Sequence, residues 1–423
     1  MLTVARMGAA RDEGQRIAYQ MIAAGSKTII SRPARALLAA LSVILFIPML
    51  AIPLQDKASL EQFHTRSLAK WPSFEFLTDP VRYFAEGKKW IADRIYPIAQ
   101  ASTLQNNFLF YVLHTAPQRR ITLGRNDFIF VNGDAEEHVN NLFEAACVRP
   151  DNLELVEDFK NSLSLMAAFA RDRGISIDVV LIPTLPTLYG DFLPSSVPSA
   201  YRMTCAERAA GRSPLLHIEA PSPVHYVYPF SQMHAVRDDE AFFPKANFHP
   251  TGLSLKVARD SYLVSLGASE RVEDTLQRGT ARSEVLSTYG INKDYPVYAI
   301  RNPHLTENVD AKIAMRKALV PIFKPYPVDI HAYDNSHPVL AETALMISDS
   351  FGTVASGVFA GAFRRLFHVG INNIPEGRLI ELIGRVQASA PVERLIFLVN
   401  DGNFPIITEH GRALARASVA SYR

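Results

Sequence analysis

Two short segments, about a hundred residues apart, carry the side chains that could perform chemistry. The first, F-P-K-A-N-F-H-P-T-G, supplies His249, and the second, L-M-I-S-D-S-F-G, supplies Ser350. A serine hydroxyl becomes a nucleophile when a histidine takes its proton. The pair therefore predicts the acyl chemistry of a serine esterase, with Ser350 Oγ within about 4 Å of a ring nitrogen of His249.

The segment around Ser350 predicts a strand, a tight turn and a helix. Residues 342–347 form a mostly apolar run of strand length, and residues 354–363 form an apolar run of helical length. A serine at such a junction lies near free backbone N–H groups, which can stabilise an oxyanion. The alternative is that Asp349 or Ser350 only caps the helix and that His249, one of twelve histidines, is structural.

The chain around these segments alternates strands with helices, which predicts an α/β fold with a mainly parallel sheet. Ligands of such sheets gather outside the carboxyl ends of the strands, so residues 184–189, Ser350 and Asn400 are expected on one rim. The expected elements are a hairpin at 121–130, strands at 175–182, 295–301, 327–333, 344–347 and 395–399, and helices at 151–173, 251–265 and 376–388.

Composition excludes several classes of function. The 423 residues are 48% hydrophobic and 20% charged, with a net charge of +2, so nothing indicates a nucleic-acid partner. The sequence contains no Walker loop, dinucleotide fingerprint or zinc-type cysteine spacing, so neither a cofactor nor a metal is expected. Cys147 and Cys205 could pair if the protein is exported, or could both be small buried residues.

Residues 36–54 form a run of nineteen residues without a charge, long enough for one transmembrane helix. Basic residues predominate before this run, whereas charges are more evenly balanced after it, which places the N-terminus in the cytoplasm. A cleaved signal peptide is the competing interpretation. The predicted organisation is a cytoplasmic segment (1–35), an anchor (36–55), a juxtamembrane helical region (56–118), an α/β domain (119–405) and a C-terminal tail (406–423).

Several motifs follow one another in a recognisable order: R-S-L-A-K-W-P, D-R-I-Y-P, G-R-N-D-F-I-F, L-I-P-T-L-P-T-L-Y-G-D-F-L-P, F-x-H before a T-G helix, and I-S-D-S-F-G. Their order resembles the periplasmic alginate O-acetyltransferase family of the AlgJ and AlgX type, and the resemblance covers roughly residues 60 to 400. The resemblance implies an SGNH hydrolase-like three-layer sandwich. Its histidine segment precedes its serine segment in the chain.

The resemblance also implies residue roles, with His249 as general base, Ser350 as nucleophile and Asp349 within the serine block. The family usually has D-x-H-W and G-D-S-F, whereas this chain has Asn247 in the acid position, Pro250 after the histidine and Ser348 before Asp349. The lysine often found before Y-x-x-x-L-P is also missing, with Leu185 and Thr187 in that stretch. An amide cannot stabilise an imidazolium by charge, and the corresponding change in a serine protease costs about 10⁴ in turnover. Rescue would need another carboxylate, for which the candidates are Asp238, Asp239, Glu240 and Asp401.

The charge pattern predicts a membrane anchor with the α/β domain in the periplasm, and the resemblance implies an O-acetyltransferase of the inner membrane that acts on an alginate-like exopolysaccharide. The resemblance implies a membrane-bound O-acyltransferase partner as acetyl donor. Tyr189, Arg125 and Asn400 are candidate contacts to the polysaccharide. The alternatives are a non-catalytic polysaccharide-binding or assembly subunit with an incomplete triad, and a carbohydrate acetylesterase that differs only in using water to release the acyl group.

Overall fold

The computed structural model describes residues 69–71, 79–94, 96–135, 138–323, 329–370 and 376–421. The chain divides into two compact units, residues 1–101 and 102–423. The predicted membrane segment, 36–54, lies outside the described residues. Within the described ranges, no helix is both long enough and apolar enough to cross a membrane.

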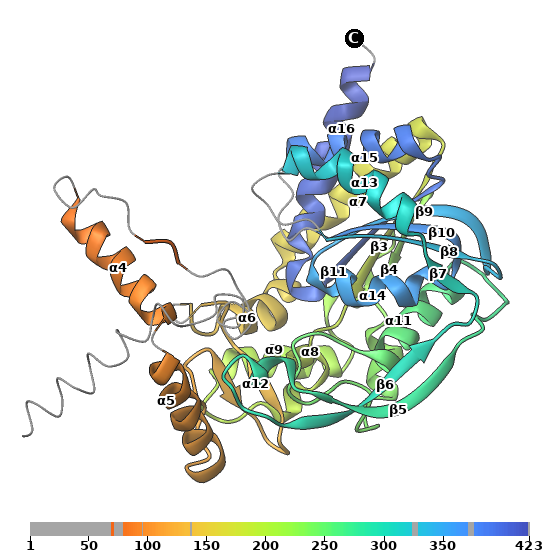
Figure 1. Ribbon diagram of the computed structural model, residues 1–423. Coiled ribbons are helices and arrows are strands. Elements are labelled where there is room, and N and C mark those ends of the chain that lie inside the picture. Colours follow the sequence, from red (N-terminus) through yellow and green to blue (C-terminus); the bar gives the residue numbers. More distant parts are fainter. Residues whose placement is uncertain are drawn as a thin grey trace, which may run out of the picture. The chain divides into compact units, whose positions relative to one another are not determined.

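A seven-stranded sheet forms the centre of the second unit (Figure 1). Its strands, in spatial order, are β4 (Val224–Val227), β3 (Ser176–Ile182), β11 (Arg394–Asn400), β9 (Leu340–Ser348), β10 (Phe363–Gly370), β8 (Asp329–Asn335) and β7 (Leu305–Glu307). Every neighbouring pair from β4 to β10 is parallel, and β8 pairs antiparallel with both β10 and β7. The mainly parallel α/β sheet predicted from sequence is therefore present, with antiparallel strands at one edge.

Helices cover both faces of this sheet because its central strands are apolar on both sides. Successive side chains of β3 point to opposite faces of the sheet. Val179 and Leu181 belong to one hydrophobic cluster, and Val180 and Ile182 belong to the other. The first face packs against α7 (Leu153–Arg173), α13 (Val309–Phe323), α15 (Glu376–Ser389) and α16 (Pro405–Ser421). The second face packs against α8 (Leu185–Leu188), α10 (Phe230–Ala235), α11 (Gly252–Ser265) and α14 (Ser350–Ala360).

The C-terminal residues differ from the tail expected at 406–423. Residues 405–421 form α16, whose Ile407, Ala413 and Leu414 are buried in the cluster shared with α7. The apolar side chains recur at helical spacing, so the segment completes one face of the core.

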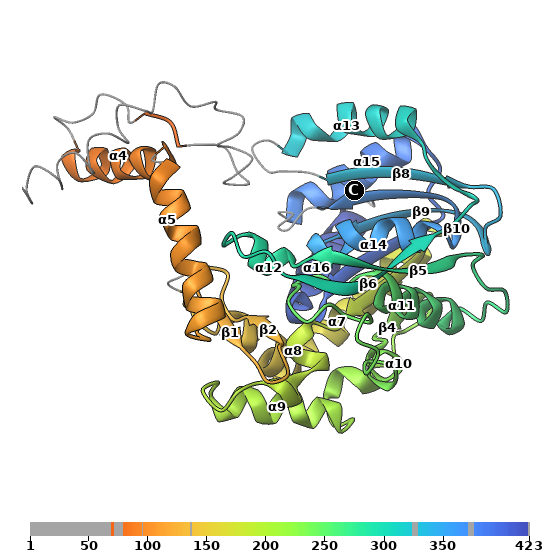
Figure 2. The ribbon, with the colours of Figure 1, turned by 60° about the horizontal axis from the view of Figure 1, so that its bottom comes forward.

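Shorter elements complete the second unit. They are the β1 (Ile121–Leu123) and β2 (Ile129–Val131) hairpin, α6 (Asn141–Phe143), α9 (Ser199–Ala209), and a ribbon of β5 (Thr275–Arg282) and β6 (Asp294–Arg301) that carries α12 (Glu284–Ser287) at its turn, while α5 (Tyr96–Asn107) spans the boundary between the two units. The ribbon runs beside α11 (Figure 2). The backbone of Tyr298 in β6 comes so close to Gly252 that a side chain at Gly252 would collide with it. In the first unit, α4 (Pro80–Arg94) brings Trp90 against Trp71.

The two cysteines form a disulfide with their Cα atoms 4.9 Å apart. Cys147 lies in a short π-helix (Glu144–Val148) that follows α6, and Cys205 lies in α9, so the bridge joins two segments that are 58 residues apart in sequence. Both side chains are fully buried. The bond fastens the α6 segment to the body of the second unit beside the carboxyl ends of the strands.

Candidate active site

Ser350 lies at the junction between β9 and α14. The strand ends at Ser348, Asp349 takes an extended conformation, and the helix begins with Ser350 itself. Asp349 caps this helix, because its Oδ1 accepts a hydrogen bond from Phe351 N at 2.9 Å. This arrangement places the Ser350 side chain at the carboxyl end of a central strand and at the N-terminus of a helix, as the sequence predicted.

Asp349 belongs to the frame of the site. Its Oδ2 accepts hydrogen bonds from Asn400 N at 2.9 Å, Asn400 Nδ2 at 2.7 Å and Asn403 Nδ2 at 3.0 Å. Burial raises the pKa of this carboxyl, although the hydrogen bonds from Asn400, Asn403 and Phe351 work against that rise. Both oxygens are engaged with the helix and the loop after β11, so Asp349 fixes the position of Ser350 and leaves proton transfer to other groups.

His249 faces the serine from the loop before α11. Its Nε2 lies 2.9 Å from Ser350 Oγ, which meets the predicted limit of about 4 Å. The imidazole contacts the rings of Phe248 and Phe351, with centroid separations of 5.1 and 5.3 Å. These aromatic contacts hold the plane of the imidazole, so its second nitrogen has a fixed direction.

The second nitrogen of His249 faces Glu284, a residue that was not among the predicted ones. His249 Nδ1 lies 2.5 Å from Glu284 Oε1, and Glu284 Oε2 accepts a hydrogen bond from His249 N at 3.2 Å. Partial burial tends to raise the pKa of Glu284. The hydrogen bonds and the charge of His249 nevertheless hold this pKa below its ordinary value. A charged carboxylate at Nδ1 selects the tautomer in which Nε2 can accept a proton from the serine.

The prediction that Asn247 occupies the acid position is wrong. Asn247 Oδ1 accepts a hydrogen bond from the backbone N of Glu284 at 2.9 Å. It therefore positions the residue that carries the carboxylate, and the carboxylate itself reaches His249 from the turn of the β5–β6 ribbon. The other candidates lie elsewhere: Asp238 is exposed, Asp239 bonds Tyr298, Glu240 pairs with Arg278, and Asp401 bonds Tyr228.

We expect Asn247→Asp to leave esterase turnover within about threefold of wild type, because the carboxylate that orients His249 is already present. An aspartate Oδ1 can still accept the Glu284 N–H, so the backbone contact survives the change. Asn247→Ala, by contrast, removes the acceptor and should lower turnover more than Asn247→Asp does. The measurement is hydrolysis of a chromogenic acetyl ester. A rise of orders of magnitude in Asn247→Asp would contradict the assignment of Glu284.

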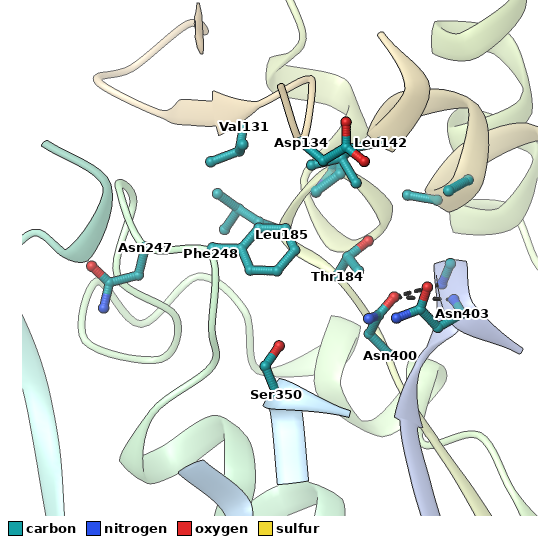
Figure 3. A pocket seen from close by; sticks show the side chains of 14 residues that line it. Val131, Asp134, Leu142, Thr184, Leu185, Asn247, Phe248, Ser350, Asn400 and Asn403 are labelled. Carbon is teal, nitrogen blue, oxygen red and sulfur yellow. Dashed lines mark hydrogen bonds between the residues drawn. The ribbon is translucent and has the colours of Figure 1, made fainter. Parts of the chain in front are cut away.

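The hydroxyl of Ser350 opens into a pocket of about 330 Å³. Ser350 points into this pocket near the ring of Phe248, while the amide of Asn247 is directed away from it (Figure 3). Thr184 and Asn400 line the same pocket, which agrees with the predicted rim at the carboxyl ends of β3, β9 and β11. Its full lining combines apolar and polar groups: Val131, Asp134, Leu142, Ala145, Ala146, Thr184, Leu185, Pro186, Asn247, Phe248, Ser350, Asn400, Gly402 and Asn403.

A second pocket, of about 270 Å³, adjoins the first. The two share Val131, Asp134, Leu142 and Phe248 in their linings. The second pocket is also lined by Arg120, Glu284 and Tyr289, and Arg120 Nε donates to Tyr289 Oη at 2.6 Å. Ser350 and Glu284 therefore line two adjoining pockets that have Phe248 in common.

Two of the predicted substrate contacts lie away from these pockets. Tyr189 is only 4% exposed, and its hydroxyl donates to the carbonyl of Arg237 at 2.8 Å. Burial raises the pKa of Tyr189, and the ring packs against Phe128. The guanidinium of Arg125 donates to the carbonyl of Asp191. Neither Tyr189 nor Arg125 lines either pocket, so of the three predicted contacts only Asn400 remains beside Ser350.

Comparisons with known proteins give similarities of structure only. No protein-family model matches the sequence, and no curated protein matches it. PatB1 of Bacillus cereus has a TM-score of 0.40 and 12% identity, covering 59% of this chain and 90% of that one. The O-acetyltransferase domain of Pseudomonas putida AlgJ has a TM-score of 0.39 and 11% identity, with 68% and 92% covered. Pseudomonas aeruginosa AlgX has a TM-score of 0.38 and 11% identity, with 74% and 70% covered.

Proposed function

We propose that this protein transfers an acyl group through a covalent intermediate on Ser350, with His249 as general base and Glu284 as the acid that orients it. The observation that carries this proposal is the continuous hydrogen-bonded chain from Ser350 Oγ through the imidazole of His249 to the Glu284 carboxylate. A nucleophile, a base and an orienting acid within hydrogen-bond distance form the arrangement that serine hydrolases and acyltransferases share.

The first half of the reaction transfers the acyl group from the donor to the enzyme. Ser350 Oγ attacks the acyl carbonyl while its proton passes to His249 Nε2, and the Glu284 carboxylate stabilises the imidazolium. The negative charge on the carbonyl oxygen develops beside the N-terminus of α14, and we assign the N–H of Ser350 as one of its donors. The leaving group takes the proton from His249 Nε2, and the acyl group remains on Ser350 as an ester.

The second half transfers the acyl group to an acceptor hydroxyl. His249 Nε2 takes the proton of the acceptor hydroxyl, and the acceptor oxygen attacks the ester carbonyl. The bond between the acyl carbon and Ser350 Oγ then breaks, and Ser350 Oγ regains the proton from His249 Nε2. The amides of Asn400 and Asn403, the hydroxyl of Thr184 and the ring of Phe248 line the approach. Polar hydrogen-bonding groups beside an aromatic ring suit the hydroxyls and the apolar face of a sugar, which supports a carbohydrate acceptor.

The acetyl group, the polymer and the cellular location are part of the proposal and rest on the sequence. The motif order supports acetyl transfer to an alginate-like exopolysaccharide, with a membrane-bound O-acyltransferase as donor. The uncharged run at 36–54 and the charges that precede it support an inner-membrane anchor with the catalytic domain in the periplasm. The disulfide between Cys147 and Cys205 also fits an oxidising compartment.

The alternative of a non-catalytic polysaccharide-binding or assembly subunit no longer has an argument in its favour. That alternative was motivated by the missing aspartate at position 247, and the carboxylate of Glu284 supplies the charge beside His249. Transfer and hydrolysis share the acyl-enzyme and differ only in whether a sugar or water releases the acyl group.

The test is to trap the acyl-enzyme and follow its fate. We expect the purified full chain to release a burst of nitrophenol from p-nitrophenyl acetate and to carry one acetyl group on the peptide that contains Ser350. Addition of an oligosaccharide acceptor should speed turnover and yield an O-acetylated sugar. An unmodified Ser350 under burst conditions would overturn the acyl-enzyme, whereas a labelled serine that only water deacylates would make the protein an esterase.

A further inference from the structure

A second group of reactive side chains lies on β8 and β10, beneath the start of α14. In the antiparallel register of these strands His331 is opposite His368, and Asp329 is opposite Gly370. One potential ligand atom from each of Asp329, His331 and His368 lies within 4.8 Å of the other two. Among the described residues, these three form the one group of at least three histidine, cysteine or acidic residues whose potential ligand atoms lie this close together.

His368 presents a buried nitrogen lone pair to this group. Its side chain is fully buried, and its Nε2 lies 2.8 Å from Ser348 Oγ. The Ser348 hydroxyl donates its proton to the carbonyl of Asp349 at 2.8 Å, so it accepts from His368 Nε2–H. Nδ1 is therefore the unprotonated nitrogen, and it has no hydrogen-bond partner.

Asp329 and His331 complete the group with complementary atoms. Asp329 Oδ2 is buried and has no hydrogen-bond partner, while its Oδ1 lies 3.2 Å from His331 Nε2. The other nitrogen of His331, Nδ1, lies 3.0 Å from Glu307 Oε1. Two buried acceptor atoms of this group, His368 Nδ1 and Asp329 Oδ2, thus have no hydrogen-bond donor, which is costly unless a cation binds there.

We propose that Asp329, His331 and His368 bind a divalent transition-metal ion of the zinc class. Two imidazoles and one carboxylate favour such an ion over Mg²⁺ or Ca²⁺, which prefer oxygen ligands. Zinc bonds of 2.0–2.1 Å in a tetrahedral site separate ligand atoms by about 3.3 Å, close to the spacing of Asp329 Oδ1 and His331 Nε2. The three ligand atoms lie within 4.8 Å of one another, so on binding the third ligand would have to rotate inward, and a water molecule would take the fourth position.

Metal-binding histidines usually have an oxygen atom hydrogen-bonded to the ring nitrogen that does not bind the metal, and both histidines of this group have one. The non-ligating nitrogen of each imidazole is held by an oxygen: Glu307 for His331 and Ser348 for His368. Such contacts fix the ring and its tautomer, which raises metal affinity. The side chains of His331 and Asp329 are 25% and 40% exposed, so an ion can enter from solvent.

The ion would also act on the serine segment. Ser348 joins His368 to the residues that lead into α14, and a side chain at Gly352 in that helix would collide with Ser348. An ion bound at His368 Nδ1 therefore holds fixed the segment two residues before Ser350. The site is distinct from the triad, because the group consists of Asp329, His331 and His368 and includes none of Ser350, His249 and Glu284.

Zinc binding by the full chain tests this proposal. The chain is purified in detergent without a histidine tag, stripped with a chelator, and titrated with Zn²⁺ by calorimetry and with Co²⁺ by visible absorption. We expect one equivalent to bind with the spectrum of tetrahedral cobalt and to raise the melting temperature as the metal concentration rises. His331→Ala should weaken binding by at least about 100-fold, more than the loss of an outer hydrogen-bond partner usually costs.

His304→Ala is the matched control. His304 has the same exposure as His331 and also pairs with a glutamate, Glu273, at 2.9 Å, but it lies outside the group. This variant should bind zinc as wild type does. Asp329→Asn should bind weakly while melting, without metal, near the wild-type temperature, which separates lost binding from lost folding. The proposal is overturned if wild type binds no stoichiometric ion, or if His331→Ala and wild type bind equally well.

Discussion

Ser350→Ala should lower the turnover of an activated acetyl ester by roughly 10⁵- to 10⁶-fold, the loss seen when a triad nucleophile is removed. The change removes the hydroxyl that lies 2.9 Å from His249 Nε2, so the acyl-enzyme cannot form. The methyl group of alanine occupies less space than the hydroxymethyl group, and the cap at Asp349 remains, so the fold should survive. The measurement is the steady-state rate together with mass analysis of the Ser350 peptide.

Ser199→Ala provides the matched control for this substitution. Ser199 is also the first residue of a helix, α9, and is exposed outside the pocket. Its replacement should leave both the rate and the adduct unchanged. If Ser350→Ala kept more than about a hundredth of the wild-type rate, at an unchanged melting temperature, the reaction would not proceed through this serine.

Glu284→Gln should lower turnover by about 10⁴-fold, as the change from acid to amide does in a serine protease. Glutamine can still accept the His249 N–H, which keeps the loop in place, but it can offer its own N–H to Nδ1 and so favour the wrong tautomer. The Michaelis constant should change little, because the amide affects the protonated transition state more than substrate binding.

The wild-type carboxylate has a lowered pKa, so it should remain charged as the pH falls into the mildly acidic range. The acid-side loss of wild-type activity should therefore not reflect protonation of Glu284, and the drop in Glu284→Gln should persist from mildly acidic to neutral pH. Glu154→Gln is the control, because Glu154 is an exposed acid in the first turn of α7. A loss of less than tenfold in Glu284→Gln would remove Glu284 from the proposed mechanism.

Ser350 and His249 could be predicted from the sequence because each lies in a short continuous segment with a recognisable pattern. Ser350 follows an apolar strand and precedes a helix, and that local pattern alone places its hydroxyl at the carboxyl end of the sheet. His249 likewise precedes the cap of α11. Their contact required the fold, but the positions of both residues followed from periodicity and from the order of the motifs.

Glu284 could not be found in this way. It lies 35 residues after His249 in the turn of an exposed ribbon, behind Ser283, whose hydroxyl caps a short helix. Serine followed by glutamate at a helix start is common and carries no sign of chemistry. Only the pairing of β5 with β6 and the hydrogen bond from the Glu284 backbone to Asn247 bring this carboxylate to the imidazole.

The fold shows the same division between local and tertiary information. The continuous apolar runs of β3 and β11 were recognised as strands, because both of their faces are buried. β10 was missed, since the predicted helix extended to residue 363, whereas α14 ends at Ala360 and the strand begins at Phe363. The eight residues of β5 are all exposed, so no alternation of burial marked that strand. The metal ligands proposed here are likewise brought together only by the pairing of β8 with β10.

The four hydrogen bonds that Asp349 accepts also bear on how distant relatives of this chain should be sought and sorted. A sequence search for S-D-S-F would select for the contact between α14 and the loop after β11. A protein can keep this contact after it has lost catalytic activity. Divergent homologues that lost their activity would then be gathered together with those that retained it. An alignment that also requires an acid at the position of Glu284, whose backbone the Asn247 side chain holds, separates the two.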